Sequence, residues 1–218
     1  QDPKSDTLVT NFAEMWLGVR KLDGLVPLAT SFPSFRVSLR NSAKNETRNF
    51  IRHLRANNLP ISELLNANYS FLNAELASHY QVPGVTGDTF RQVTFPASAQ
   101  RRGLLTQMTF LMSTSAPYGT LPVRRGYTVL QDFICAAPPP APPNLPSLDE
   151  TSSPDASKAD RFAAHRQRGT SCLNCHQLMD PVGLAFESFD AVGSYRTRDG
   201  ELLIVPSGIL PGNVSFKD

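Results

Sequence analysis

The residues best suited to chemistry are Cys172, Cys175 and His176, which form the pattern Cys-x-x-Cys-His. Two thiols three positions apart lie one helical turn from each other, so each can form a thioether with one vinyl group of a haem. The histidine that follows directly can bind the haem iron as its proximal ligand. The pattern therefore predicts one covalent haem c whose iron is bound by His176.

Three other uses of these residues stay open. A thioredoxin-like redox pair normally has a strand before it, whereas a helix is expected before Cys172. A structural zinc would need two more ligands, for which Cys135 and His165 are candidates, although the sequence has no second Cys-x-x-Cys pair. A plain disulfide would account for the two cysteines and would leave His176 without a role.

The motif does not give the iron ligand on the side opposite His176. Met179 follows the motif, but three positions after His176 it shares that residue's helix face. We therefore expect Met179 to pack at the haem edge. The upstream candidates for the distal ligand are His53, His79, His165, Met15, Met108 and Met112.

His165 is the preferred distal candidate. It lies seven residues before Cys172, and an extended chain of that length reaches about 23 Å, enough to pass round a haem. It could instead bond to a haem propionate or cap its own helix. Propionates need cationic partners, which could come from Arg161, Arg166, Arg168 and Arg196 nearby in the sequence, or from Arg101, Arg102, Arg124 and Arg125.

Helices are expected to position these residues, so the predicted fold class is mainly α. The spacing of apolar residues predicts helices over 5–19, 35–57, 62–65, 71–80, 103–112, 122–135 and 157–167, with short strands over 90–95 and 202–205. The continuous apolar run 103–112 could instead be a strand. The outer face of the 35–57 helix is expected to carry the charged residues Arg40, Lys44, Glu46, Arg48, Arg52 and Arg55, exposed to solvent.

A run of seven prolines between residues 136 and 157 predicts an extended strap or linker. We therefore expect three regions: a helical, bundle-like domain over 1–97, a connecting helical region with the proline-rich strap over 98–148, and a cytochrome c-like haem-attachment segment over 149–218. Cys135, just before the prolines, is expected to be a buried free thiol.

Composition excludes several classes of protein. Apolar residues make up 40% of the 218 residues and the net charge is +2, unlike a disordered chain. A charge this small gives no general electrostatic reason to bind nucleic acid. The sequence contains no run of 18 apolar residues, so it predicts no membrane span. The chain begins Gln-Asp-Pro without a secretion signal, so it starts either after a cleavage site or inside a longer polypeptide, and we expect the second.

Several sequence blocks occur in an order typical of one family: 12–17, 45–50, 64–80, 102–107, 122–126, the proline run and, most specific, 165–196. In these blocks the chain resembles the C-terminal half of planctomycete-type cytochrome c-domain proteins. The resemblance implies an exported bacterial haem protein that works with further domains or subunits. It also implies that His165 belongs to the motif, as a ligand or a haem-pocket residue.

The residues after the motif have physical roles in such a site. Asp180 can cap a helix that restarts there, and Gly183 permits close approach of backbone to the macrocycle. Phe186 and Phe189 can cover the haem. Glu187 and Asp190 can pair with Arg196 or Arg198, or could hold a calcium ion, although their spacing is not that of an EF-hand.

The expected function is electron transfer through one haem c in the bacterial periplasm or at the cell surface, with a redox partner protein. Two histidine ligands would saturate the iron and leave no position for a substrate. One alternative is a peroxidase-like or oxygenase-like haem enzyme with an open distal position. Another is a haem-bearing structural module of a larger cell-surface assembly.

Overall fold

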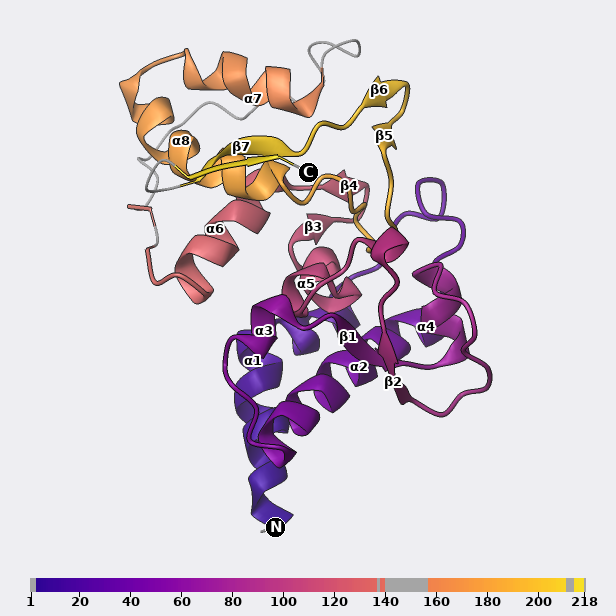
Figure 1. The fold of residues 1–218 in the computed structure, drawn as a ribbon. Helices are drawn as coiled ribbons and strands as arrows, with labels where there is room; N and C mark the ends of the chain where they lie inside the picture. Colours follow the sequence, from indigo (N-terminus) through magenta and orange to yellow (C-terminus); the bar gives the residue numbers. More distant parts are fainter. Residues whose placement is uncertain (1–2, 137, 140–156, 211–213, 218) are drawn as a thin grey trace. The chain divides into compact units, whose positions relative to one another are not determined.

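The computed structural model describes residues 3–136, 138–139, 157–210 and 214–217 (Figure 1). About 51% of the chain is helical and its strands are short, which confirms the mainly α prediction. The chain divides into two compact units, residues 1–119 with 189–195 and residues 120–188 with 196–218. Most of the proline-rich strap, and the boundary expected after residue 148, lie outside the described residues. The expected three regions therefore stay a prediction.

The first unit is built around α2 (Val37–Ala56), whose buried apolar residues recur at helical spacing. Before α2 come 3-10 helices at Pro3–Asp6 and Val19–Gly24, a π-helical segment at Leu8–Ala13 and α1 (Glu14–Trp16). After it come α3 (Glu63–Asn66), β1 (Tyr69–Leu72), α4 (Ala74–His79), β2 (Arg91–Thr94), 3-10 helices at Ala97–Ala99 and Leu104–Thr106, α5 (Met108–Ser113) and β3 (Ser115–Ala116). Strand β4 (Gly119–Thr120) includes the last residue before the second unit and the first residue of that unit. Strands β1 and β2 pair antiparallel, with Tyr69 opposite Thr94.

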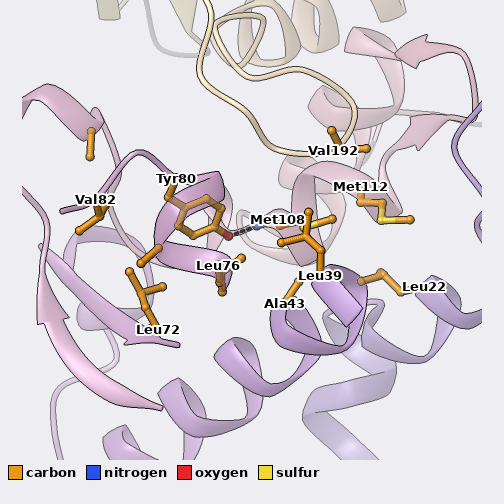
Figure 2. Close-up of a cluster of buried hydrophobic side chains, with 12 residues drawn as sticks. Leu22, Leu39, Ala43, Leu72, Leu76, Tyr80, Val82, Met108, Met112 and Val192 are labelled. Atoms are coloured by element: carbon orange, nitrogen blue, oxygen red, sulfur yellow. Dashed lines mark hydrogen bonds between the residues drawn. The ribbon is translucent and has the colours of Figure 1, made fainter. Parts of the chain in front are cut away.

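The core of the first unit joins residues that are far apart in the sequence. Figure 2 shows Leu39 of α2, Leu76 of α4 and Met108 of α5 in one cluster with Val192. Val192 comes from the segment 189–195, which follows α8 in the sequence but belongs to the first unit. The backbone N–H of Met108 donates to the Tyr80 hydroxyl at 2.7 Å. The side chain of Met108 is fully buried in this apolar cluster.

The prediction that the charged residues of α2 are exposed is wrong for Glu46, which is fully buried. Its carboxyl accepts hydrogen bonds from Ser70 and Tyr80, both at 2.7 Å. Burial raises the pKa of Glu46 to about 7. The Arg101 guanidinium lies 3.6 Å from the centre of the Tyr80 ring and donates to the carbonyl oxygens of Thr106 and Gly193.

Three predicted helices of the first unit differ from the structure. The helix expected over 5–19 is divided into 3-10, π-helical and α-helical segments, of which α1 is the α-helical one. The helix expected over 71–80 begins at Ala74, because Asn73 caps it by accepting the backbone N–H of Leu76 at 3.0 Å. Residues 71–72 belong to β1 instead. The helix expected over 103–112 is divided by Gln107, whose backbone is extended. The helices expected over 35–57 and 62–65 are confirmed to within two residues at each end.

The second unit contains α6 (Pro122–Asp132), α7 (Lys158–Arg166) and α8 (Thr170–Leu184). Two antiparallel hairpins follow, β5 (Arg198–Asp199) with β6 (Leu202–Leu203) and β7 (Ser207–Leu210) with β8 (Val214–Lys217). Helix α8 packs against both α6 and α7. The helices expected over 122–135 and 157–167 are present, although α6 ends at Asp132.

Two glycines allow α6 and α8 to cross with their backbones in contact. A Cβ atom added to Gly183 would lie 1.9 Å from the carbonyl oxygen of Pro122, and one added to Gly126 would lie 2.0 Å from that of Met179. Only a residue without Cβ fits such an approach. Gly183 therefore serves helix packing, and its expected approach to the macrocycle stays a prediction.

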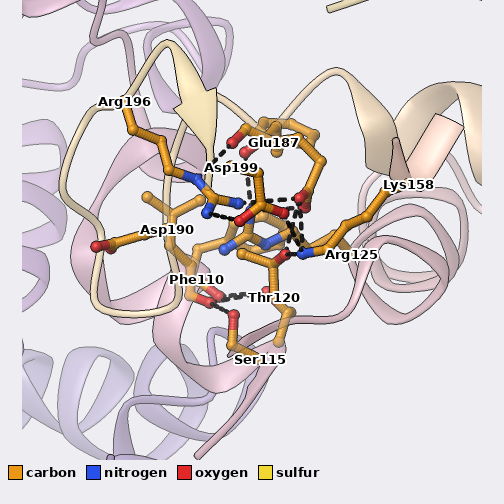
Figure 3. Close-up of polar contacts among 12 residues, drawn as sticks. Phe110, Ser115, Thr120, Arg125, Lys158, Glu187, Asp190, Arg196 and Asp199 are labelled. Carbon is orange, nitrogen blue, oxygen red and sulfur yellow. Dashed lines mark hydrogen bonds and ion pairs between the residues drawn. The ribbon is translucent and has the colours of Figure 1, made fainter. Parts of the chain in front are cut away.

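A buried cluster of charged residues stabilises the C-terminal end of α8 (Figure 3). The Glu187 carboxylate accepts from Thr120 at 2.8 Å and pairs with Lys158 and Arg196, each at 3.1 Å. Arg125 is fully buried, 3.6 Å from Glu187, and donates to the carbonyl oxygen of Phe186 at 2.8 Å. The predicted pair of Glu187 with Arg196 is confirmed.

Candidate haem-attachment site

The motif occupies the first two turns of α8. This helix begins at Thr170, directly after Gly169, so Cys172 and Cys175 lie one turn apart. Both thiols are free and partly exposed. Helix α7, rather than a strand, precedes the motif, which is not the order of elements in a thioredoxin-like redox site.

His176 is held by an aspartate one turn later in the same helix. Its Nδ1 lies 2.8 Å from Oδ1 of Asp180, which is fully buried. The other carboxylate oxygen, Oδ2, accepts from Nη1 of Arg166 at 2.7 Å. When Nδ1–H donates to this carboxylate, Nε2 of the neutral ring carries no proton, which is the form that binds a metal. Asp180 lies inside a continuous helix, which corrects its expected role as the cap of a helix that restarts.

His165, in the last turn of α7, lies beside His176. The centres of the two imidazole rings are 4.6 Å apart and the ring planes meet at 67°. The His165 ring is buried, and its Nδ1 has no hydrogen-bond partner among the described residues. Burial is the main cause that lowers the pKa of His165. A neutral imidazole with an unpartnered buried nitrogen suits a metal ligand or a haem-pocket residue.

The distance between the two rings limits how they could share one iron atom. Metal–nitrogen bonds of about 2 Å would place the centres of two imidazoles on opposite sides of a metal roughly 6 Å apart. The observed 4.6 Å is shorter. The two rings would therefore have to separate by more than 1 Å to become axial ligands of the same iron.

Phe162 is a neighbour of the motif that the sequence analysis missed. Its buried ring lies 6.3 Å from that of His176, measured between ring centres. It lies three positions before His165 and so shares that residue's face of α7. This spacing from His165, together with its apolar ring, is the signal by which it could have been found.

The other predicted site residues lie farther along the helices. Met179 is buried in α8 where that helix crosses α6. Phe186 lies in the turn after α8, where its carbonyl accepts from Arg125. Arg161 is in the first half of α7 and lines a cavity of about 580 Å³ together with Lys158, Leu184 and Leu202. Phe189 contacts Tyr195 and Arg101 in the first unit.

The alternative sites gain no set of ligands from the structure. Among the described residues, no group of three or more His, Cys, Asp or Glu side chains could hold a metal ion, as a zinc or calcium site of protein ligands requires. Cys135 is exposed, which corrects the expected burial of its thiol. Asp190 accepts the backbone N–H groups of Val192 and Ser194. In the part of the chain that the structure describes, no helix is both long and apolar enough to cross a membrane.

Two family models match separate parts of the sequence. Residues 101–199 match PSCyt3, a protein of unknown function (DUF1588), and this match contains α7 and α8 with the motif. Residues 1–82 match PSD4, a protein of unknown function (DUF1592). The chain is similar to two domains found in planctomycete-type cytochrome c proteins. The resemblance expected from the sequence blocks is thus confirmed at the level of these domains.

The PSD4 match lies within the first unit, whereas the PSCyt3 match includes residues of both units. The boundary between compact units therefore differs from the boundary between the two family models. No curated protein and no solved structure shows a significant match to the chain.

Proposed function

We propose that the chain carries one haem c, attached through Cys172 and Cys175, and transfers electrons in the bacterial cell envelope. The observation that supports this most is the state of His176. Its Nδ1 is engaged by the buried Asp180, so the ring presents Nε2 from the same helical turns that carry two free thiols. This donor set fits haem c, because the two thiols and the next residue are the groups that the attachment requires.

A bound haem supplies a one-electron couple between ferric and ferrous iron. The chain's own residues attach, orient and shield it. The thiols of Cys172 and Cys175 would hold the haem through thioethers, His176 would bind its iron, and Phe162 would exclude water beside the His176 ring. His165 is the proposed distal ligand, a role that would require its ring to lie farther from His176 than the observed 4.6 Å between ring centres. Arg161 is the proposed partner of a propionate, and Met179 and Phe186 the proposed apolar contacts of the haem.

Covalent attachment also suggests where the protein works and with what. Haem is joined to such motifs on the outer side of the bacterial inner membrane, so the proposed location is the periplasm or the cell surface. The proposed partners are a redox protein and other domains or subunits of a larger haem protein.

A haem enzyme is the second candidate, and the contact between the two histidines favours it. If His165 stays 4.6 Å from His176, it cannot lie on the far side of the iron. The distal position would then be open to a small ligand such as peroxide or oxygen, as in a peroxidase or an oxygenase.

Intact mass and optical spectra of the chain, produced in bacteria with haem-attachment machinery, test both candidates. Electron transfer predicts one covalent haem, low-spin spectra in both oxidation states, and a high-spin spectrum for His165→Ala. His53→Ala, in α2, should leave the spectrum unchanged. A high-spin ferric wild type that binds carbon monoxide when reduced would favour the enzyme. A mass without a tetrapyrrole, or a disulfide between Cys172 and Cys175, would refute the proposal.

A further inference from the structure

We propose that Asp180 is a positioning residue that lowers the reduction potential of the haem iron through His176, and that Arg166 moderates this effect. The inference rests on the proposed function, since it concerns the iron that His176 would bind. It assigns a role to two residues outside the Cys-x-x-Cys-His motif.

The three side chains form a continuous chain of short contacts. Oδ1 of Asp180 lies 2.8 Å from Nδ1 of His176, and Oδ2 lies 2.7 Å from Nη1 of Arg166. Asp180 has no exposed side-chain surface, whereas the side chains of His176 and Arg166 keep 16% and 26%. A carboxylate so deeply buried is poorly screened by water, so its charge acts strongly on both partners.

The direction of the effect follows from charge. Ferric iron carries one more positive charge than ferrous iron, so any group that raises electron density on the axial imidazole stabilises the ferric state more. A carboxylate that accepts a hydrogen bond from Nδ1–H raises the basicity of the ligand in this way. Asp180 therefore lowers the reduction potential. Arg166 withdraws part of the same negative charge, so its presence raises the potential.

The opposed signs separate this role from a merely structural one. Asp180→Asn keeps the shape of the side chain and removes its charge, and should raise the potential. Loss of a partner of a metal ligand typically costs about 10- to 100-fold in metal affinity or activity. A 10-fold weaker preference for ferric iron equals about 59 mV for a one-electron couple. Arg166→Gln should shift the potential in the opposite direction.

The experiment is a spectroscopic redox titration of the haem-loaded chain and its variants. Asp199→Asn is the matched control, because Asp199 pairs with Lys158 and Arg196 in the same unit. It changes the net charge as Asp180→Asn does and should leave the potential near that of the wild type. Arg166→Gln keeps the test decisive if Asp180→Asn does not fold.

The outcomes distinguish this inference from the proposed function. A wild type without covalent haem in its mass spectrum would overturn both. A haem-loaded wild type whose Asp180→Asn and Arg166→Gln variants shift in the same direction, or match the Asp199→Asn control, would overturn the inference alone. Shifts of opposite sign, with the control unchanged, would support it.

Discussion

Replacing Gly183 by alanine should destabilise the second unit more than a single methyl group normally can. The added Cβ would meet backbone atoms of α6, at 1.9 Å from the Pro122 oxygen and 2.5 Å from its carbon. Real Cβ atoms essentially never approach closer than 3.0 Å. Because backbone cannot rotate out of the way as a side chain can, the two helices must separate by about 1.1 Å.

The size of the effect is a balance of two contributions. Overpacking of this kind costs about 1–3 kcal/mol, and the upper value suits a collision with backbone. Alanine regains about 1 kcal/mol over glycine through its better helix propensity. We therefore expect the free energy of unfolding to fall by about 2 kcal/mol.

Urea unfolding of the haem-loaded chain, followed by circular dichroism, measures this change. Gly119→Ala is the control, because nothing lies within 4 Å of the position that its Cβ would take. Gly126→Ala should cost about as much as Gly183→Ala, because its Cβ would meet the Met179 oxygen at 2.0 Å. The double variant should cost less than the sum, since one separation of the helices relieves both collisions. A Gly183→Ala protein as stable as the control would refute the close crossing of α6 and α8.

Three further predictions concern buried charge and the third cysteine. The pKa of Glu46 is about 7 in the folded protein against an ordinary 4.5, so its neutral form stabilises the fold fully below pH 4.5 and this contribution is lost as the pH rises through 7. Glu46→Gln should therefore gain up to about 3 kcal/mol relative to the wild type between pH 4.5 and 8, and an equal difference in urea melts at both pH values would contradict the burial of this carboxyl. Arg125→Leu should lose about 3 kcal/mol in the same assay, because a buried charge loses a partner, whereas Arg102→Leu, at an exposed side chain, should change little. The exposed Cys135 should be the single thiol of the haem-loaded chain that a maleimide labels, and Cys135→Ser should abolish labelling; more than one label per wild-type chain would show that Cys172 or Cys175 lacks its thioether.

The helices that carry the site could be predicted because their sequences contain strong local signals. Helix α2 has regularly spaced apolar residues. Helix α7 begins at Lys158, directly after Ser157, whose side chain caps it by accepting the backbone N–H of Asp160. The strand β1 was missed because its extended conformation depends on pairing with β2, which lies some twenty residues later in the sequence. Glu46 was misplaced because a charged residue on an amphipathic helix is normally exposed, and the partners that make its burial tolerable, Ser70 and Tyr80, come from other elements.

The contact between His176 and Asp180 could have been expected from their spacing, but Pro181 misled the prediction of the helix that carries them. The two residues are four positions apart, the spacing at which side chains meet on a helix. Pro181, however, favours a break in a helix, so Asp180 was expected to begin a new one. Helix α8 continues through Pro181 to Leu184, and the carboxylate therefore faces His176. Only the structure shows this continuity.

The return of residues 189–195 to the first unit has a consequence for biosynthesis. A ribosome that has released residues 1–119 has not yet supplied Val192 to the core or the Gly193 carbonyl to Arg101. The first unit therefore cannot complete its core, and the Arg101 guanidinium lacks one of its acceptors, until the residues after α8 have been synthesised. The first unit thus completes its fold only after the cysteine motif has been synthesised. A product truncated before residue 189 would lack segment 189–195 of the first unit and residues 196–218 of the second.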